Sequence, residues 1–157
     1  MSAELIKFKF IKALSYLPLL FLVAFGFAFM MFQGFPNRVF SSAPISIGLG
    51  VIAFLIGTVL VLWSEKVRHR LFSKRDGLVC DDFAEGIYKY SRHPGTLGFL
   101  ILFFGFGFFL NSMAFIMVGL AHFILLSFVF IPLVEHQIIK VCGDSYQEYR
   151  ANVRMWL

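Results

Sequence analysis

The feature that most constrains this chain is an apolar run that extends over residues 96–134. A transmembrane helix needs about 20 predominantly apolar residues, so this run is long enough to cross a membrane twice. Two shorter apolar runs precede it, at residues 14–32 and 45–63. Only 15% of the chain is charged, against roughly 25% in soluble domains. The sequence therefore predicts an all-α integral membrane bundle with four transmembrane helices.

The long run is expected to fold as a helical hairpin. The uncharged pair Asn111-Ser112 predicts a tight turn between the third and fourth spans. The third span should begin near Pro94, because a proline in the first helical turn needs no N–H. The fourth should run from residue 113 to about residue 134, with a kink at Pro132. Its helix should then continue past the apolar run and end at Gly143.

The rest of the chain predicts no second domain. The tail from Asp144 is expected to form a short amphipathic helix, because aspartate is a good N-cap. Residues 1–13 are interpreted as a short arm of mixed charge. No Gly-x-Gly-x-x-Gly pattern follows a strand, so no Rossmann domain is predicted. The single membrane domain, residues 1–157, is divided into two N-terminal spans (1–63), a cytoplasmic loop (64–95), and the hairpin with the C-terminal helix (96–157).

The positive charges predict how the chain is oriented. Of the 14 Lys and Arg residues, all except Arg38 lie before the first span, between the second and third spans, or after the fourth. Cytoplasmic segments carry an excess of these residues, so both termini and the long loop are predicted to be cytoplasmic. Cations spread along a membrane rim suit lipid headgroups rather than nucleic acid. The first apolar run exceeds the about 7–15 residues of a signal-peptide core, which favours an uncleaved span.

The two cysteines of the chain, Cys80 and Cys142, carry no metal signature. Neither belongs to a pair with the spacing of a zinc site, and no metal is predicted. Both lie on the predicted cytoplasmic side, where disulfides are rare. We therefore do not expect a disulfide.

Two polar clusters flank the hairpin and should return to the same side of the membrane. The first, Arg92-His93-Pro94, supplies hydrogen-bond donors beside a helix N-terminus, which suits a bound carboxylate. An arginine that contacts lipid phosphate beside a capping histidine explains it equally well. The second contains Glu135, directly after an apolar span. A carboxylate at that depth usually has a partner or ligand, although a solvated helix end is the alternative.

His122 lies in the middle of the fourth span. A histidine within the membrane is a functional candidate by default. A neutral imidazole bonded to a neighbouring carbonyl is the simpler interpretation, and we favour it.

The C-terminal half, residues 78–157, resembles a known family. The motifs are Gly86-Ile87-Tyr88-Lys89-Tyr90-Ser91-Arg92-His93-Pro94-x-x-x-Gly98, a hydrophobic hairpin, Glu135-x-x-x-Ile139, Gly143-x-x-Tyr146-x-x-Tyr149 and Val153-x-Met155. In this order and spacing they resemble the isoprenylcysteine carboxyl methyltransferase and phospholipid methyltransferase family. The resemblance makes residues 78–157 the catalytic half.

The resemblance implies an integral membrane enzyme that uses S-adenosylmethionine to methylate a small lipophilic acceptor, a carboxylate or an amine, which enters from the bilayer. It assigns no oligomeric state. The catalytic residues carried over are Arg92, His93 and Glu135. The residues expected around the cofactor are Cys80, Asp81, Asp82, Phe83, Tyr88, His93, Pro94, Gly95, Thr96 and Glu135.

This chain departs from the family pattern at three positions. Thr96 stands where the family usually has tyrosine, and His136 where it usually has a second glutamate. Ile131 replaces the arginine of the prenylcysteine enzymes, which argues against a prenylcysteine carboxylate as acceptor. Two alternatives stay open: a non-catalytic membrane protein on the same scaffold, and an NADPH-dependent membrane enzyme similar to sterol reductases.

Overall fold

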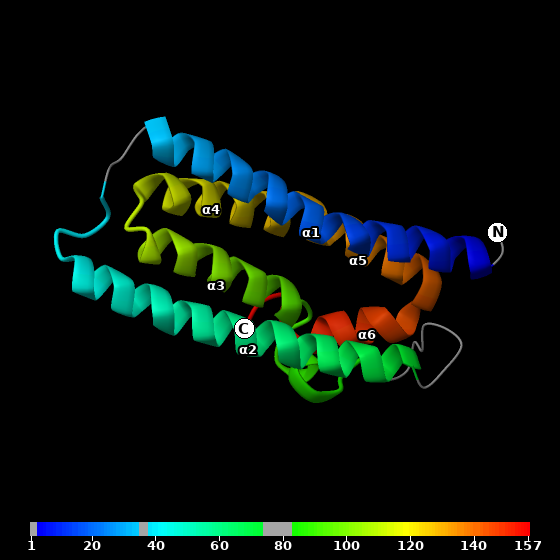
Figure 1. The fold of residues 1–157 in the computed structure, drawn as a ribbon. Helices are drawn as coiled ribbons and strands as arrows, with labels where there is room; N and C mark the ends of the chain where they lie inside the picture. The colour runs from blue at the N-terminus through cyan, green and yellow to red at the C-terminus, as the bar shows by residue number, and fades with distance from the viewer. Residues whose placement is uncertain (1–2, 35–37, 74–82) are drawn as a thin grey trace.

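A computed structural model describes residues 3–34, 38–73 and 83–157, and these residues are almost entirely helical (Figure 1). No strand occurs among them, so the predicted all-α fold is confirmed for the described residues. The helices are α1 (Ala3–Gly34), α2 (Ala43–Ser73), the 3-10 helix η1 (Gly86–Lys89), α3 (Pro94–Phe109), α4 (Met113–Leu125), the π-helix η2 (Leu126–Phe130), α5 (Ile131–Cys142) and α6 (Asp144–Asn152).

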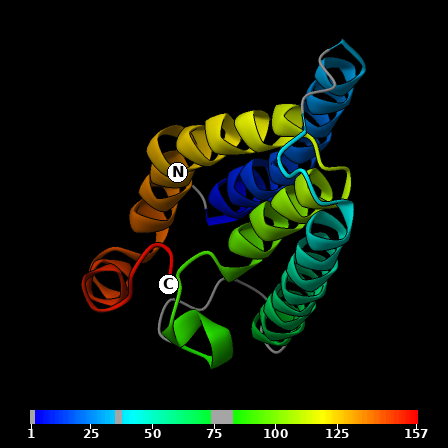
Figure 2. The same ribbon diagram turned by 90° about the vertical axis from the view of Figure 1, so that its left-hand side faces the viewer.

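The helices pair along their lengths. α3 packs along α2, and α1 packs along α4 (Figure 1, Figure 2). The backbones of α2 and α3 approach closely where two glycines meet: a Cβ on Gly57 would lie 2.8 Å from the carbonyl oxygen of Gly98. Small residues let membrane helices approach this closely. The close contact fixes the start of α3 against α2.

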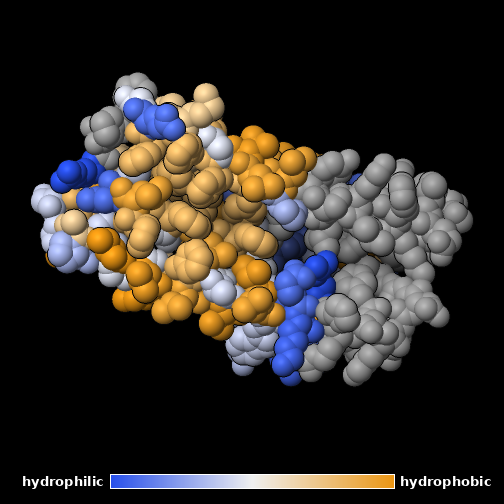
Figure 3. Space-filling model, in the orientation of Figure 1, coloured by the Kyte–Doolittle hydropathy of each residue, from blue (hydrophilic) through white to orange (hydrophobic). Residues whose placement is uncertain are grey.

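Two of the helical stretches, Ala43–Arg68 and Met113–Lys140, are long and apolar enough to cross a membrane. The stretches Pro18–Gly34 and Pro94–Phe109 are apolar but shorter. Large apolar side chains cover much of the described surface (Figure 3), with Leu55 on α2 61% exposed. Such a surface suits lipid rather than water. The cytoplasmic placement of both termini stays a prediction.

One prediction about the N-terminus is wrong. Residues 3–13, interpreted above as an arm, are part of α1, which begins at Ala3. Lysine lowers the hydropathy of this segment but is a good helix former. The helix therefore extends beyond the apolar run.

The turn between α3 and α4 is where the sequence predicts it, and it also holds the loop after α1. Asn111 adopts a left-handed backbone conformation, with φ of 51°. Its side-chain oxygen accepts hydrogen bonds from the backbone N–H groups of Val39, at 3.0 Å, and Phe40, at 2.8 Å. Its amide donates to the carbonyl of Phe40 at 2.9 Å. The side chain of Asn111 thus holds the loop after α1 against the turn between α3 and α4.

A π-turn that was not predicted from the sequence lies just before Pro132, where a kink is predicted. Pro132 has no N–H to donate, and its ring opposes the carbonyl four residues before it. The helix accommodates one extra residue in η2, which ends at Phe130, two residues before Pro132. An extra residue rotates everything after it by about 100°. A single buried stripe results, made of His122, Leu126, Ile131 and Glu135, each at most 5% exposed.

Candidate functional site

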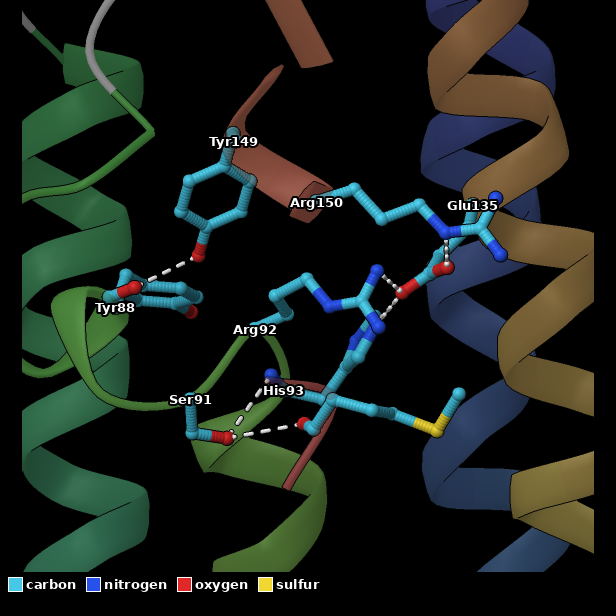
Figure 4. Close-up of polar contacts among 8 residues, drawn as sticks. Tyr88, Ser91, Arg92, His93, Glu135, Tyr149 and Arg150 are labelled. Atoms are coloured by element: carbon cyan, nitrogen blue, oxygen red, sulfur yellow. Dashed lines mark hydrogen bonds and ion pairs between the residues drawn. The ribbon is translucent and has the colours of Figure 1, made fainter. Parts of the chain in front are cut away.

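The candidate site centres on the carboxylate of Glu135, at the end of the bundle where α5, α6 and the loop before α3 meet (Figure 4). Its side chain is 2% exposed. Oε1 lies 2.9 Å from Arg92 Nη1 and 3.0 Å from His93 Nε2. Oε2 lies 3.3 Å from Nε of Arg150, on α6. The predicted meeting of the two polar clusters is therefore confirmed.

Among the described residues, the charges in this cluster do not balance. Arg92 and Arg150 are both permanently charged, and Glu135 supplies the one carboxylate among those residues that pairs with them. Arg92 is held where water reaches little of it, since its side chain is 8% exposed. A buried charge is costly unless it is paired and hydrogen-bonded. The cluster therefore has a surplus of positive charge that an anionic group could offset.

Some polar atoms of the cluster also lack hydrogen bonds. Nε and Nη1 of Arg92 and Oε2 of Glu135 are buried without a hydrogen-bond partner among the described residues. The Nη1–Oε1 and Arg150 Nε–Oε2 contacts are close enough for ion pairs but lack hydrogen-bond geometry. Buried polar groups are nearly always satisfied in proteins. Donors and an acceptor thus lie side by side with unused bonding capacity.

An aromatic cluster adjoins the charged one. Phe83 packs on Tyr146 and Tyr149 of α6, with ring centroids 5.1 and 5.5 Å apart. The hydroxyl of Tyr149 donates to the backbone carbonyl of Tyr88 at 2.8 Å. Burial raises the pKa of Tyr88 to about 12, and it also raises the pKa values of Tyr146 and Tyr149. All three phenols are therefore neutral donors at physiological pH.

A cleft of about 400 Å³ lies beside this aromatic cluster. Its walls come from the segment before η1 and from α6. They do not include Arg92, His93 or Glu135. The contacts among those three side chains are therefore outside the cleft. Its lining residues are Phe83, Ala84, Ser145, Glu148, Tyr149, Asn152 and Val153.

The structure separates the predicted site residues into groups. Arg92, His93 and Glu135 come together. Phe83 packs on the tyrosine rings of α6, and Tyr88 accepts the hydrogen bond of Tyr149 through its backbone carbonyl. Pro94 and Thr96 are buried in the first turn of α3. Gly95 faces α2, because a Cβ there would lie 2.8 Å from Oγ of Ser64. Cys80, Asp81 and Asp82 lie outside the described residues.

The sequence reasoning missed Arg150, which we counted only among the tail cations. Its side chain is 52% exposed, so neither burial nor hydropathy marks it. The available signal is its place next to Tyr149, on the helix face that meets the bundle.

The prediction that the chain forms no disulfide is wrong, because Cys142 is disulfide-bonded. Compartment governs whether such a bond persists, not whether cysteines approach one another.

The remaining predicted candidates do not join the cluster. His136 is exposed on α5. His122 is 5% exposed and packs edge-on against Phe21, with ring centroids 4.4 Å apart. Its Nε2 has no hydrogen-bond partner among the described residues, so the predicted bond to a carbonyl is not made by this atom.

Comparison with known proteins places the chain by family. No curated protein and no solved structure matches it. A family model described as "Protein of unknown function (DUF1295)" matches residues 3–153, nearly the whole chain. That family lies in the membrane superfamily that contains steroid reductases and proteins like the isoprenylcysteine carboxyl methyltransferases. The chain therefore belongs to the DUF1295 family of helical membrane proteins.

Proposed function

We propose that this protein is an integral membrane methyltransferase that uses S-adenosylmethionine and acts on a small lipophilic acceptor. The observation that carries the proposal is the buried carboxylate of Glu135 against His93 and Arg92, with unused hydrogen-bonding capacity on both charges. The cluster lies where an apolar bundle meets a polar tail. A water-soluble methyl donor and an acceptor from the bilayer could meet there.

The residues fit the amino-acid end of S-adenosylmethionine. That end carries an ammonium and a carboxylate on one carbon. Glu135 Oε2 is a buried acceptor without a hydrogen bond, and Arg92 Nε is a buried donor without one. Glu135 would hold the ammonium, and Arg92, aided by Arg150, would hold the carboxylate. When bound, the cofactor supplies a methyl group on a sulfonium.

Positioning is the main task left to the protein, because methyl transfer is an in-line displacement. The rings of Phe83, Tyr146 and Tyr149 pack together on the tail side of the cluster, where they would limit the access of water. The apolar helices would admit the acceptor from the bilayer. An acceptor carboxylate needs no base. An amine would have to lose a proton, and His93 or His136 would be the candidate base.

A membrane reductase is the second candidate. The surplus of positive charge at Arg92 and Arg150 favours it, because a nicotinamide dinucleotide carries phosphates that guanidinium groups bind. Steroid reductases also lie in the same superfamily as this chain. A non-catalytic protein on the same scaffold is the remaining alternative.

Ligand-induced stabilisation separates these possibilities. A ligand that binds only the folded protein raises its melting temperature. We expect S-adenosylhomocysteine to stabilise the purified protein in detergent, and NADPH to leave it unchanged. Stabilisation by NADPH alone would favour the reductase, and no effect of either would favour the non-catalytic alternative. Labelled S-adenosylmethionine with a membrane lipid extract would then identify the species that gains the label.

A further inference from the structure

Ser91 links the loop that carries Arg92 and His93 to the C-terminal segment. Its side chain is completely buried. Its hydroxyl donates to the backbone carbonyl of Met155 at 3.2 Å and accepts from the backbone N–H of His93 at 3.3 Å. Figure 4 shows this hydroxyl between the two backbones. One hydroxyl thus joins two segments that are far apart in the sequence.

A second bond runs parallel to the first. The backbone N–H of Arg92 donates to the carbonyl of Arg154 at 3.0 Å. Two successive loop residues are therefore tied to two successive tail carbonyls. His93 has φ of −130° and ψ of 53°, outside the regular helical and extended regions. The loop is thus irregular at His93, and these bonds connect it to the C-terminal segment.

The C-terminal segment is itself anchored at both ends. The backbone N–H of Val153 donates to the carbonyl of Tyr149, which caps α6. Trp156 packs on Phe123 of α4, with ring centroids 5.5 Å apart. A large aromatic contact of this kind contributes beyond its buried area. The segment is therefore fixed to the bundle independently of the loop.

We propose that Ser91 is a positioning residue and that residues 153–156 are the template on which it sets Arg92 and His93 against Glu135. Among the described residues, neither Ser91 nor Trp156 forms a hydrogen bond or ring contact with Glu135. Both act through the loop backbone. Catalytic side chains must be held to within about 0.5 Å, which is the task of such supporting contacts. The proposal concerns geometry, and only its ligand-binding consequence rests on the proposed function.

The matched control is Ser46. Like Ser91, it is completely buried and donates its hydroxyl to a backbone carbonyl, that of Phe108, at the other end of the bundle. Ser91→Ala and Ser46→Ala each remove one such donated bond, and Ser91→Ala also removes the acceptor of the His93 N–H. Both melting temperatures should therefore fall, that of Ser91→Ala by somewhat more, and the site is compared at a temperature at which both variants are folded. A difference between the two variants in the ring signals of His93 then reflects where the serine lies, and does not reflect a general loss of stability.

The test follows the ring signals of His93 by NMR in histidine-labelled protein, assigned by their loss in His93→Gln. In the wild-type background, Glu135→Gln should shift these signals, because the two side chains are in contact. The shift should be lost in the Ser91→Ala background and kept in the Ser46→Ala background. An undiminished shift in Ser91→Ala would overturn the proposal.

A second pair of variants tests the same proposal if Ser91→Ala does not fold. Trp156→Ala should also abolish the shift, and Trp156→Phe, which keeps a ring against Phe123, should restore it. A shift that survives in Trp156→Ala would contradict the role of the template. Where wild-type protein binds S-adenosylhomocysteine, Ser91→Ala should weaken binding about tenfold, or about 1.4 kcal/mol. Absence of binding by the wild type would refute the proposed function and leave the NMR result intact.

Discussion

Glu135 Oε1 lies 3.0 Å from His93 Nε2, although 42 residues and a complete helical hairpin separate the two side chains. The hairpin returns the chain to its starting side, and the π-turn then rotates Glu135 inward. The cluster therefore depends on backbone geometry over the whole C-terminal half. The predictions below test its parts separately.

Glu135→Ala should remove affinity for S-adenosylhomocysteine and destabilise the protein by about 3 kcal/mol, because the variant leaves Arg92 buried without a counter-charge. Replacing Glu135 and Arg92 together by methionine should restore most of the stability but none of the affinity. Thermal unfolding and a binding titration measure the two effects. The control is Glu148→Ala, an exposed acid on α6, and wild-type affinity in Glu135→Ala would refute the assignment.

Arg92→Ala should weaken ligand binding far more than Arg68→Ala. Arg68 forms an exposed ion pair with Glu65 on α2 and, among the described residues, has no hydrogen bond or ion pair with Glu135. Pairs of that kind contribute about 0–1 kcal/mol. Binding titrations of both variants check the difference. Equal losses would instead indicate that the two arginines serve only as general contacts for headgroups.

Stability should fall at alkaline pH. Burial raises the pKa of Tyr88 from 10.0 to about 12 and raises that of Tyr149 as well. The folded state therefore keeps protons that the unfolded state loses. This contribution is fully present below pH 10 and is lost as the pH rises toward the folded pKa, with a slope of up to about 1.4 kcal/mol per pH unit for each tyrosine. Urea unfolding between pH 9 and 11 measures the slope, which Tyr88→Phe should reduce. An unchanged slope in that variant would exclude Tyr88 as its source.

His122→Phe should leave stability unchanged or raise it by about 1 kcal/mol. The imidazole is buried among Phe21 and Phe103, and its Nε2 has no partner in the described part of the chain. Removing an unsatisfied buried polar group relieves a desolvation cost. Melting temperature in detergent gives the answer. A large decrease would mean that the imidazole binds a polar group within the bundle.

The length of the apolar run was enough to predict the hairpin. The polar pair Asn111-Ser112 predicted the turn, and Gly143 predicted the end of the last helix of the hairpin, because these residue types favour turns and helix ends. The meeting of His93 and Glu135 followed from the hairpin. The resemblance of residues 78–157 to a family supplied the roles, which stay predictions.

Other features depend on tertiary contacts that no local pattern reveals. Arg150 reaches Glu135 only because α6 folds back onto the bundle. The π-turn is one of several ways in which a helix can accommodate Pro132, and packing decides among them. The helical start of α1 at Ala3 reflects helix propensity, whereas hydropathy predicted an arm.

Because η2 contains an extra residue, the direction of the Glu135 side chain depends on the number of residues in this segment more than on which apolar residues they are. Exchanging one apolar side chain for another between residues 126 and 131 would leave the direction of Glu135 unchanged. Deleting any one of these residues would turn α5 by about 100° and carry the carboxylate out of reach of both arginines. Insertions and deletions should therefore be tolerated least where the helix looks most uniform in sequence.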